Sequence, residues 1–268
     1  MTFTRTEMIA VVERSPHTIE ARDRHGWVDL FTPDARIEDP VGSRPHIGRD
    51  RIERFYDTFI GPRRLRLHPE TDLVVGTTVL RDLRLEVTMA AGLPLDIPAF
   101  LRYDLAADGT ELRIAALQAF WELPTMIGSF LRSGPRAVPA GLGLSRALLV
   151  NQGLSGAAGF LAGLRTLGSH GRKGFGGFLA DAATGDEVAV RRRLARGARI
   201  TLGDDEPMTA TALLTRLAGT RASKVICAGG AVVARIERAG RRDIVIAHAD
   251  PRPLTINRIR YFTEQPQG

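Results

Sequence analysis

The feature that most constrains the fold is a change of pattern near Leu73. From there to Trp121 the chain consists of short runs suited to β-strands, separated by turn residues that include Asp108-Gly109. The sequence before Leu73 predicts helices. Residues 18–31 are predicted as one helix, and a second helix has an apolar face made by Ile52, Phe55, Tyr56 and Phe59. Helices followed by consecutive strands predict an α+β domain, in which helices cover one face of a curved antiparallel sheet.

The C-terminal part of the chain repeats this plan in shorter form. Placing Asp186 on Asp23 without gaps puts Leu194 on Phe31, and a helical stretch and four strand-like runs follow in the same order. We interpret this pattern as an internal duplication. The predicted domains are residues 1–123, a helical linker at 124–173 that is rich in Gly, Ala and Leu, and a degenerate second copy at 174–268.

The linker contains 18 consecutive uncharged residues between Arg146 and Arg165. That length reaches the lower limit for a membrane span, but polar residues and glycines interrupt it. Gly159-x-x-x-Gly163 is a spacing that permits close helix packing. A buried helical linker is our leading interpretation, and peripheral membrane contact through residues 137–168 is the alternative.

Composition narrows the classes of partner. The formal net charge is +7, which suits anionic partners, but the basic residues are dispersed among acids except at 191–193. No nucleic-acid-binding motif accompanies them, so we expect no nucleic-acid binding. Cys227 is the single cysteine, and no metal-ligand cluster or cofactor motif stands out. The N-terminus lacks the long apolar core of a secretory signal, and a cytoplasmic location is expected.

One segment carries a family resemblance. Glu38-Asp39-Pro40 with Gly42, then His46-x-Gly48-Arg49 and a helix bearing Phe55-Tyr56, resemble the ketosteroid isomerase branch of the nuclear transport factor 2-like superfamily. A run of residues ending in Trp121 resembles the last strand of that fold. The resemblance covers about residues 10–123 and, more loosely, the tail.

The resemblance implies a cone-shaped pocket between the sheet and the helices on its concave face. In that family an aspartate after the first strand removes a proton next to a carbonyl and returns it elsewhere. Asp39 falls on this base, Tyr56 on a tyrosine of the pocket's hydrogen-bond network, and Trp121 on an aromatic residue beside the base. The residues predicted to contact a ligand are Phe55, Phe59, Phe100, Trp121, His17 and Asp96.

The departures from the family concern the groups that stabilise an enolate. Counting back from Asp39, the family's donor tyrosine is replaced by Ser15, and its neutral carboxylic acid by Ala99. Loss of one such donor typically costs on the order of 100-fold in rate. Tyr56, His17 and Asp96 are possible substitutes. In the second copy Leu202 stands where Asp39 would be, which predicts a lid or packing role for that copy.

The leading interpretation is a steroid delta-isomerase-like enzyme. It would transfer a proton on a small apolar carbonyl compound of the steroid or polyketide class, with Asp39 as general base, Tyr56 in a catalytic role and no cofactor. The alternatives are a non-catalytic carrier of hydrophobic ligands and a scaffold in which the two halves pair. A homodimer is also possible.

Overall fold

The computed structural model of the protein describes residues 3–88, 94–132, 146, 150–151, 159, 163, 166–251 and 254–264. The chain divides into two compact units, Met1–Leu164 and Arg165–Gly268. We describe each unit by itself. The division falls within the segment predicted as a linker, most of which lies outside the described residues. The three predicted domain boundaries therefore stay a prediction.

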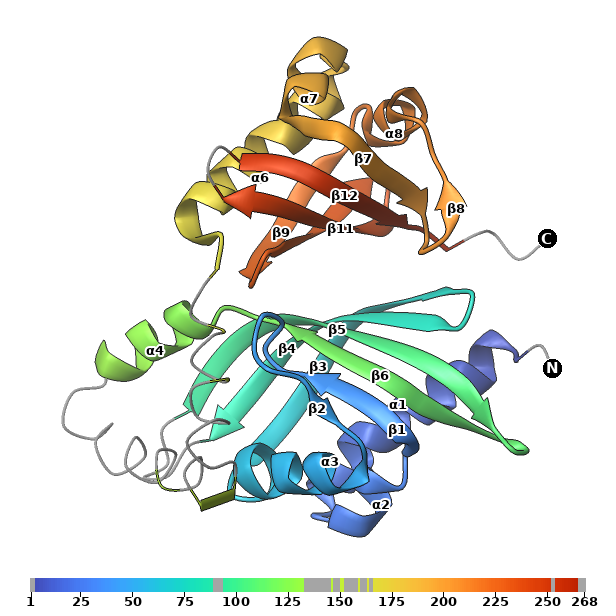
Figure 1. Cartoon of the computed structure of the whole chain (residues 1–268), viewed down its shortest axis with the longest axis vertical. Coiled ribbons are helices and arrows are strands. Elements are labelled where there is room, and N and C mark those ends of the chain that lie inside the picture. Colours follow the sequence, from blue (N-terminus) through green and yellow to red (C-terminus); the bar gives the residue numbers. More distant parts are fainter. Residues whose placement is uncertain are drawn as a thin grey trace. The chain divides into compact units, whose positions relative to one another are not determined.

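The first unit contains one six-stranded sheet and several helices (Figure 1). Its helices are α1 (Arg5–Glu20), α2 (Arg24–Val28), α3 (Arg49–Phe55), the π-helical turn η1 (Tyr56–Ile60) and α4 (Leu123–Arg132). Its strands are β1 (Phe31–Glu38), β2 (His46–Ile47), β3 (Arg64–Val75), β4 (Thr78–Thr88), β5 (Pro94–Asp108) and β6 (Glu111–Phe120). The strand order is β2-β1-β6-β5-β4-β3.

The predicted α+β fold is confirmed, with one difference in the sheet. Strand β1 pairs with β6 in parallel, whereas the other pairs are antiparallel, so the sheet is mixed. Strands β4 to β6 occupy the region where strands were predicted, but β3 begins at Arg64, nine residues before the predicted change of pattern near Leu73. The predicted turn at Asp108-Gly109 joins β5 to β6, and Gly109 adopts a φ of +63° there.

The single helix predicted over residues 18–31 is wrong. Helix α1 begins much earlier, at a capping box in which the Thr4 backbone N–H donates to the Glu7 carboxylate at 2.7 Å. The helix ends at Glu20, because Arg22 turns left-handed with a φ of +57°. Asp23 then accepts the Gly26 N–H at 2.8 Å and caps the short helix α2.

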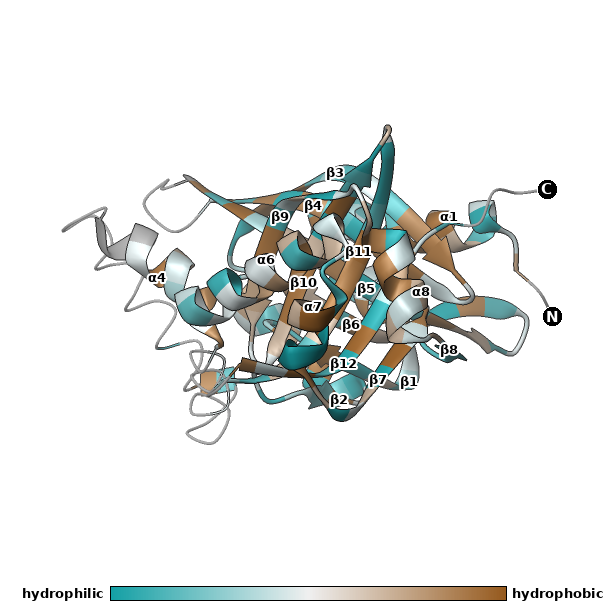
Figure 2. Cartoon of the chain, turned by 90° about the horizontal axis from the view of Figure 1, so that it is seen from above, coloured by the Kyte–Doolittle hydropathy of each residue, from teal (hydrophilic) through white to brown (hydrophobic). Residues whose placement is uncertain are grey.

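Helices α1, α2 and α3 lie on one face of the first sheet (Figure 1). Since side chains of a strand alternate between its faces, hydrophobic and hydrophilic bands alternate along the strands (Figure 2). The apolar set that faces the helices forms a core with them, which includes Met8, Val12, Trp27, Phe31, Ile52, Phe55, Tyr56, Tyr103 and Ile114.

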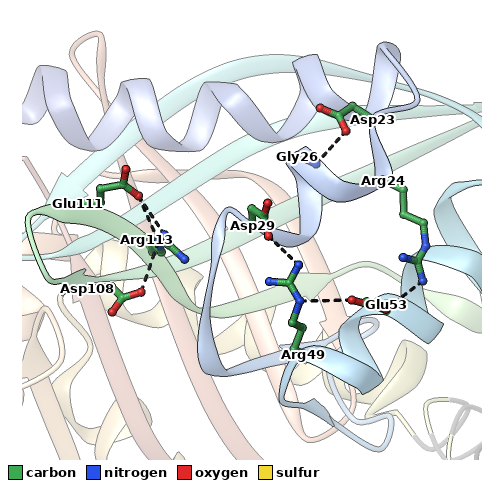
Figure 3. A network of polar contacts seen from close by, with 9 residues as sticks. All are labelled: Asp23, Arg24, Gly26, Asp29, Arg49, Glu53, Asp108, Glu111 and Arg113. Carbon is green, nitrogen blue, oxygen red and sulfur yellow. Dashed lines mark hydrogen bonds and ion pairs between the residues drawn. The ribbon is translucent and has the colours of Figure 1, made fainter.

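Ion pairs hold α2 and its flanking residues to α3. Arg24 contacts Glu53 at 3.3 Å, and Arg49 contacts Asp29 at 2.7 Å (Figure 3). Arg24 also contacts Asp57, at the start of η1, at 2.7 Å. Such exposed pairs contribute about 0–1 kcal/mol each. These ion pairs therefore matter more for orientation than for stability, because they hold α3 in the direction that turns its apolar side chains toward the sheet.

The second unit repeats the architecture. Its helices are α6 (Gly168–Thr184), α7 (Glu187–Arg193) and α8 (Ala210–Leu217), and its strands are β7 (Leu194–Leu202), β8 (Glu206–Pro207), β9 (Arg221–Ala228), β10 (Ala231–Arg238), β11 (Arg241–Pro251) and β12 (Leu254–Phe262). The strand order, β8-β7-β12-β11-β10-β9, is that of the first sheet. The layout of the two sheets fits two tandem copies.

Local details of the two units agree with the ungapped placement of Asp186 on Asp23. Asp186 caps α7 by accepting the Ala189 N–H at 2.9 Å, as Asp23 caps α2. Leu194 begins β7 and pairs with β12, as Phe31 begins β1 and pairs with β6. Both parallel pairs also carry an irregularity in register before the strand's second half.

The segment predicted to contact a membrane, residues 137–168, lies mostly outside the described residues. Within the described part of the chain, no helix has both the length and the apolar character needed to cross a bilayer.

Candidate functional site

The first unit contains a cavity of about 100 Å³ between the sheet and its helices. Its lining is apolar or aromatic apart from Asp39 and Arg63. The lining residues are Asp39, Phe55, Phe59, Ile60, Arg63, Leu65, Leu85, Val87, Ile97, Trp121 and Met126. The strand residues among them share one face of the sheet, because Leu65 pairs with Val87 and Leu85 with Ile97.

Asp39 stands on the turn that follows β1, and its neighbours fix that turn. The Val41 N–H donates to the carbonyl of Ala119 on β6 at 2.8 Å. The Glu38 carboxylate accepts the Gly42 N–H at 2.9 Å and the Gln118 side-chain amide at 3.1 Å. The turn is thus tied to the last strand on both sides of Asp39, which holds the carboxylate at the cavity.

The Asp39 carboxylate has a polar partner just beyond the end of β6, the strand that pairs with β1. Trp121 donates its indole Nε1–H to Asp39 Oδ1 at 2.6 Å. Burial among apolar side chains raises the pKa of Asp39 to about 6, and the Trp121 hydrogen bond opposes this shift because it favours the ionised form. A carboxylate whose pKa lies near 6 can exchange protons readily at neutral pH.

Arg63 brings a positive charge to the same cavity. Its Nη1 donates to the carbonyls of Thr58 and Phe59 at 2.8 Å each, at the end of η1. Burial lowers the pKa of Arg63, yet a guanidinium keeps its charge in proteins. Within the part of the chain that the structure describes, no carboxylate forms an ion pair with Arg63. The cavity therefore holds one acid and one fixed cation.

His46 flanks the aromatic wall of the cavity without lining it. Its ring lies 5.1 Å from that of Phe55 and 6.3 Å from that of Phe59, measured between centroids. Burial, together with the charges of Arg51, Arg44 and Arg54, lowers the pKa of His46 to about 4. His46 is thus neutral at pH 7, and its ring packs beside those of the two phenylalanines.

Four of the residues predicted to form the site line the cavity together: Asp39, Phe55, Phe59 and Trp121. Tyr56 does not. It is buried in the core against Trp27, with the ring centroids 5.5 Å apart, and burial raises the pKa of its hydroxyl. Tyr56 follows Phe55 directly on the helix, so its side chain leaves the helix in a different direction and misses the cavity.

The other three predicted contacts also lie away from the cavity. Phe100 and Asp96 each lie an odd number of residues from Ile97 on β5. Because side chains alternate along a strand, both face the other side of the sheet. The Asp96 carboxylate is well exposed and lies 3.5 Å from Arg84. His17 is exposed near the end of α1. The pairing of β4 with β5 runs without a bulge, so no irregularity turns Asp96 toward the cavity.

The two positions where the family's donors were expected carry none to the cavity. The Ser15 hydroxyl accepts the indole N–H of Trp27 at 3.1 Å and is hydrogen-bonded to Tyr103 inside the core. Ala99 shares the face of Ile97 but has no polar side chain. Neither residue is part of the cavity lining.

Sequence reasoning missed the strand residues of the cavity and Arg63. The alternation of Leu83, Leu85 and Val87 on β4 was a usable signal for an inward apolar face. Arg63 gave no such signal, because it follows a π-helical turn that adds a residue to the helical repeat. Among the residues that the structure describes, no group of three His, Cys, Asp or Glu side chains could hold a metal ion.

These observations define a class: an α+β domain whose sheet and helices enclose an apolar cavity, with a buried carboxylate on the turn after the first strand. Residues 12–121 match the model of the SnoaL-like domain family. The first domain is a SnoaL-like domain of the nuclear transport factor 2-like superfamily.

Three solved structures are similar to the first domain. A Delta 5-3-ketosteroid isomerase from Mycobacterium sp. is 28% identical, with 44% of this chain and 95% of that chain covered and a TM-score of 0.40. A Mycobacterium tuberculosis protein in complex with estradiol-17beta-hemisuccinate is 23% identical, with the same coverage and a TM-score of 0.41. An epoxide hydrolase/cyclase-like enzyme of pyran ring formation in salinomycin is 22% identical, with 44% and 93% covered and a TM-score of 0.40.

Proposed function

We propose that the first domain is an enzyme that moves a proton within a small apolar carbonyl compound, with Asp39 as general base. The observation that carries this proposal is the Asp39 carboxylate in an apolar cavity, with its pKa raised to about 6. At pH 7 such a group is roughly nine-tenths ionised, so it is ready to accept a proton and is a strong enough acid to return it.

The proposed reaction has two proton transfers. Asp39 accepts a proton from a carbon next to the carbonyl, and the C–H electron pair moves into the carbonyl to form an enolate. The protonated Asp39 then gives the same proton to another carbon of the conjugated system. Atoms and charges balance without a cofactor, and the product is the conjugated isomer.

Arg63 is the group we propose for stabilising the enolate oxygen. It is the cationic side chain of the cavity lining, and Ser15 and Ala99 supply no donor there. A positive charge fixed in a low-dielectric cavity stabilises developing negative charge more strongly than it would in water. Arg63 would thus replace the hydrogen-bond pair of the related isomerases.

The volume of the cavity limits the size of the substrate. At about 100 Å³ it is smaller than the roughly 300–1,000 Å³ typical of pockets for drug-sized ligands. A compound the size of one or two rings fits this volume better than a whole steroid, which would require the lining to move.

A carrier of apolar ligands is the second candidate function. The observation that favours it is the lack of donors at Ser15 and Ala99. A carrier needs the cavity alone, so it binds ligand without turning it over.

Isomerisation assays with two substrates separate these candidates. A 5-ene-3-ketosteroid and cyclohex-3-enone both gain conjugated-enone absorbance on isomerisation, and they differ in size. We would compare wild type with Asp39→Asn and with Asp96→Asn, which makes the same chemical change on the opposite face of the sheet. The proposal predicts turnover that Asp39→Asn abolishes and Asp96→Asn retains. Tight binding without turnover in all three proteins would contradict it and favour a carrier.

A further inference from the structure

A second cavity adjoins the apolar one, and its character is different. It measures about 400 Å³ and is lined by Ile19, Glu20, Arg22, Arg63, Arg64, Leu65 and Arg66. Arg63 and Leu65 line both cavities, so the two meet at the start of β3. Arg64 and Arg66 alternate with Leu65 on this edge strand, so they line the second cavity from the other face of the sheet. One is apolar and contains Asp39; the other is lined by four arginines and a single carboxylate.

Among the residues that the structure describes, the arginines of the second cavity have no carboxylate as an ion-pair partner. Elsewhere in this domain arginines pair with carboxylates, as Arg24, Arg49 and Arg113 do in Figure 3. Across the described residues, no carboxylate forms an ion pair with any of the four: Arg22, Arg63, Arg64 or Arg66. Unpaired like charges repel each other, and an anion bound between them would remove that repulsion.

The nearby carboxylates do not neutralise this cluster. Glu20 lines the cavity but forms no ion pair within the described part of the chain. Glu86 stands opposite Arg66 in the register of β3 and β4, but its carboxylate lies 3.1 Å from the ring of His68. The cavity therefore keeps a net positive charge.

The backbone at Arg22 adds a second observation. Arg22 has a φ of +57°, in the left-handed region that favours glycine, at the turn between α1 and α2. In the part of the chain that the structure describes, Ala239 is the other non-glycine residue with a positive φ. A glycine would form this turn with less strain, but it would not bring a charge to the cavity.

We propose that Arg22, Arg63, Arg64 and Arg66 form an anion-binding pocket for the substrate of the neighbouring site. The ligand would be an apolar carbonyl compound with a carboxylate, sulfate or phosphate group, its apolar part beside Asp39 and its anionic group among the arginines. This inference rests on the proposed function for the identity of the apolar cavity as a substrate site.

The experiment compares a neutral steroid with its anionic ester. Testosterone and testosterone sulfate differ by one charged group, and quenching of tryptophan fluorescence reports their binding. For wild type we expect the sulfate to bind about tenfold more tightly, and the advantage to shrink as salt is raised. The ratio of the two Kd values is the readout, because a general loss of binding leaves it unchanged.

Three variants and a control make the test specific. The double variant Arg64→Gln/Arg66→Gln should bring the ratio close to one. Arg22→Gly should lower the ratio while raising the Tm, since it relieves the left-handed strain, so misfolding cannot explain the loss. Glu20→Gln should raise the ratio, because it removes the one carboxylate. Arg192→Gln/Arg196→Gln changes the net charge equally on the second domain and should leave the ratio at its wild-type value.

The anion can also be tested alone. Inorganic sulfate should raise the Tm of wild type more than that of Arg64→Gln/Arg66→Gln, even where neither steroid binds. Equal ratios and equal sulfate shifts in both proteins would overturn the proposal. Aggregation of the double variant with an unchanged ratio would overturn it as well, and would assign these arginines to protection of the β3 edge. Failure to isomerise both the 5-ene-3-ketosteroid and cyclohex-3-enone, with the ratio as expected, would count against the proposed function alone.

Discussion

The two domains share a scaffold but not a site. In the first domain the turn after β1 carries Asp39, whose carboxylate binds Trp121 at the end of β6. The matching register of the second domain puts Leu202 and Thr263 at these two positions. The strand order and helix caps agree in both, so they suffice for the fold. The acid and its tryptophan are present in one copy alone, so the fold does not require them.

Each domain contains a different reporter residue, so the unfolding of the two domains can be followed separately. Both tryptophans, Trp27 and Trp121, are in the first domain, and the single cysteine, Cys227, is buried in the second. Tryptophan fluorescence therefore follows unfolding of the first domain, and reaction of the thiol with an aromatic disulfide follows the second. Each prediction below can be checked in the full chain.

The largest effect is expected when the second domain's residue is copied into the first. Asp39→Leu should lower kcat/KM at least about 100-fold, because the base is removed. The reverse double variant, Leu202→Asp/Thr263→Trp, should create no activity when Asp39→Leu is also present, since the residue before β9 is Thr220, whereas the residue before β3 is Arg63. Activity in that triple variant would show that the second domain is a latent site.

The stability of the first domain should depend on the protonation of Asp39. Its pKa is raised to about 6 from 3.8, so the folded state favours the protonated form. The stabilisation is fully present below pH 4 and is lost as the pH rises through 6. A shift of about two units corresponds to about 3 kcal/mol. Between pH 4.5 and 8, wild type should therefore lose most of this amount relative to Asp39→Asn in urea unfolding followed by tryptophan fluorescence. Parallel pH profiles would contradict the raised pKa.

A smaller effect is expected from Trp121→Phe. The indole hydrogen bond lowers the pKa of Asp39, so its removal should raise that pKa by up to about one unit. The acidic limb of the pH profile of kcat/KM should move upward by the same amount. Trp27→Phe removes the other indole and should leave the position of this limb unchanged. An unmoved limb in Trp121→Phe would mean that the bond has no influence on the base.

The smallest effects concern the caps that the two domains share. Asp23→Ala and Asp186→Ala should each lower the stability of its own domain by about 1 kcal/mol, because each removes a side-chain acceptor at a helix start. Tryptophan fluorescence should detect the first loss and Cys227 reactivity the second. A loss that appears in both domains from one variant would contradict their independence.

The sequence predicted the repeated parts best, because their signals are local. Alternation predicted the strands, and the ungapped placement of Asp186 on Asp23 agrees with the two caps and the parallel register. The first helix was missed because its break depends on one left-handed residue, Arg22, which no periodicity reports.

Part of the site was also predictable, because some of its residues belong to a local motif or to one face of a helix. Asp39 and Trp121 came from a motif resemblance, and Phe55 and Phe59 from one helical face. Phe100, Asp96 and Tyr56 lie outside the cavity lining, because a shift of one residue on a strand or a helix turns a side chain in another direction. Arg63 lies beyond the π-helical turn, where neither the α-helical repeat nor the alternation of a β-strand predicts the direction of a side chain.

The central claim is that the apolar cavity makes Asp39 a base, and its pKa can be measured without knowing the substrate. Titration of the Asp39 side-chain carboxyl by ¹³C NMR, assigned with Asp39→Asn, is the most direct test. We expect a pKa of about 6 for Asp39, well above the ordinary value for an aspartate. A value near 4 or below would mean that the cavity does not raise the basicity of this carboxylate, and would contradict the account.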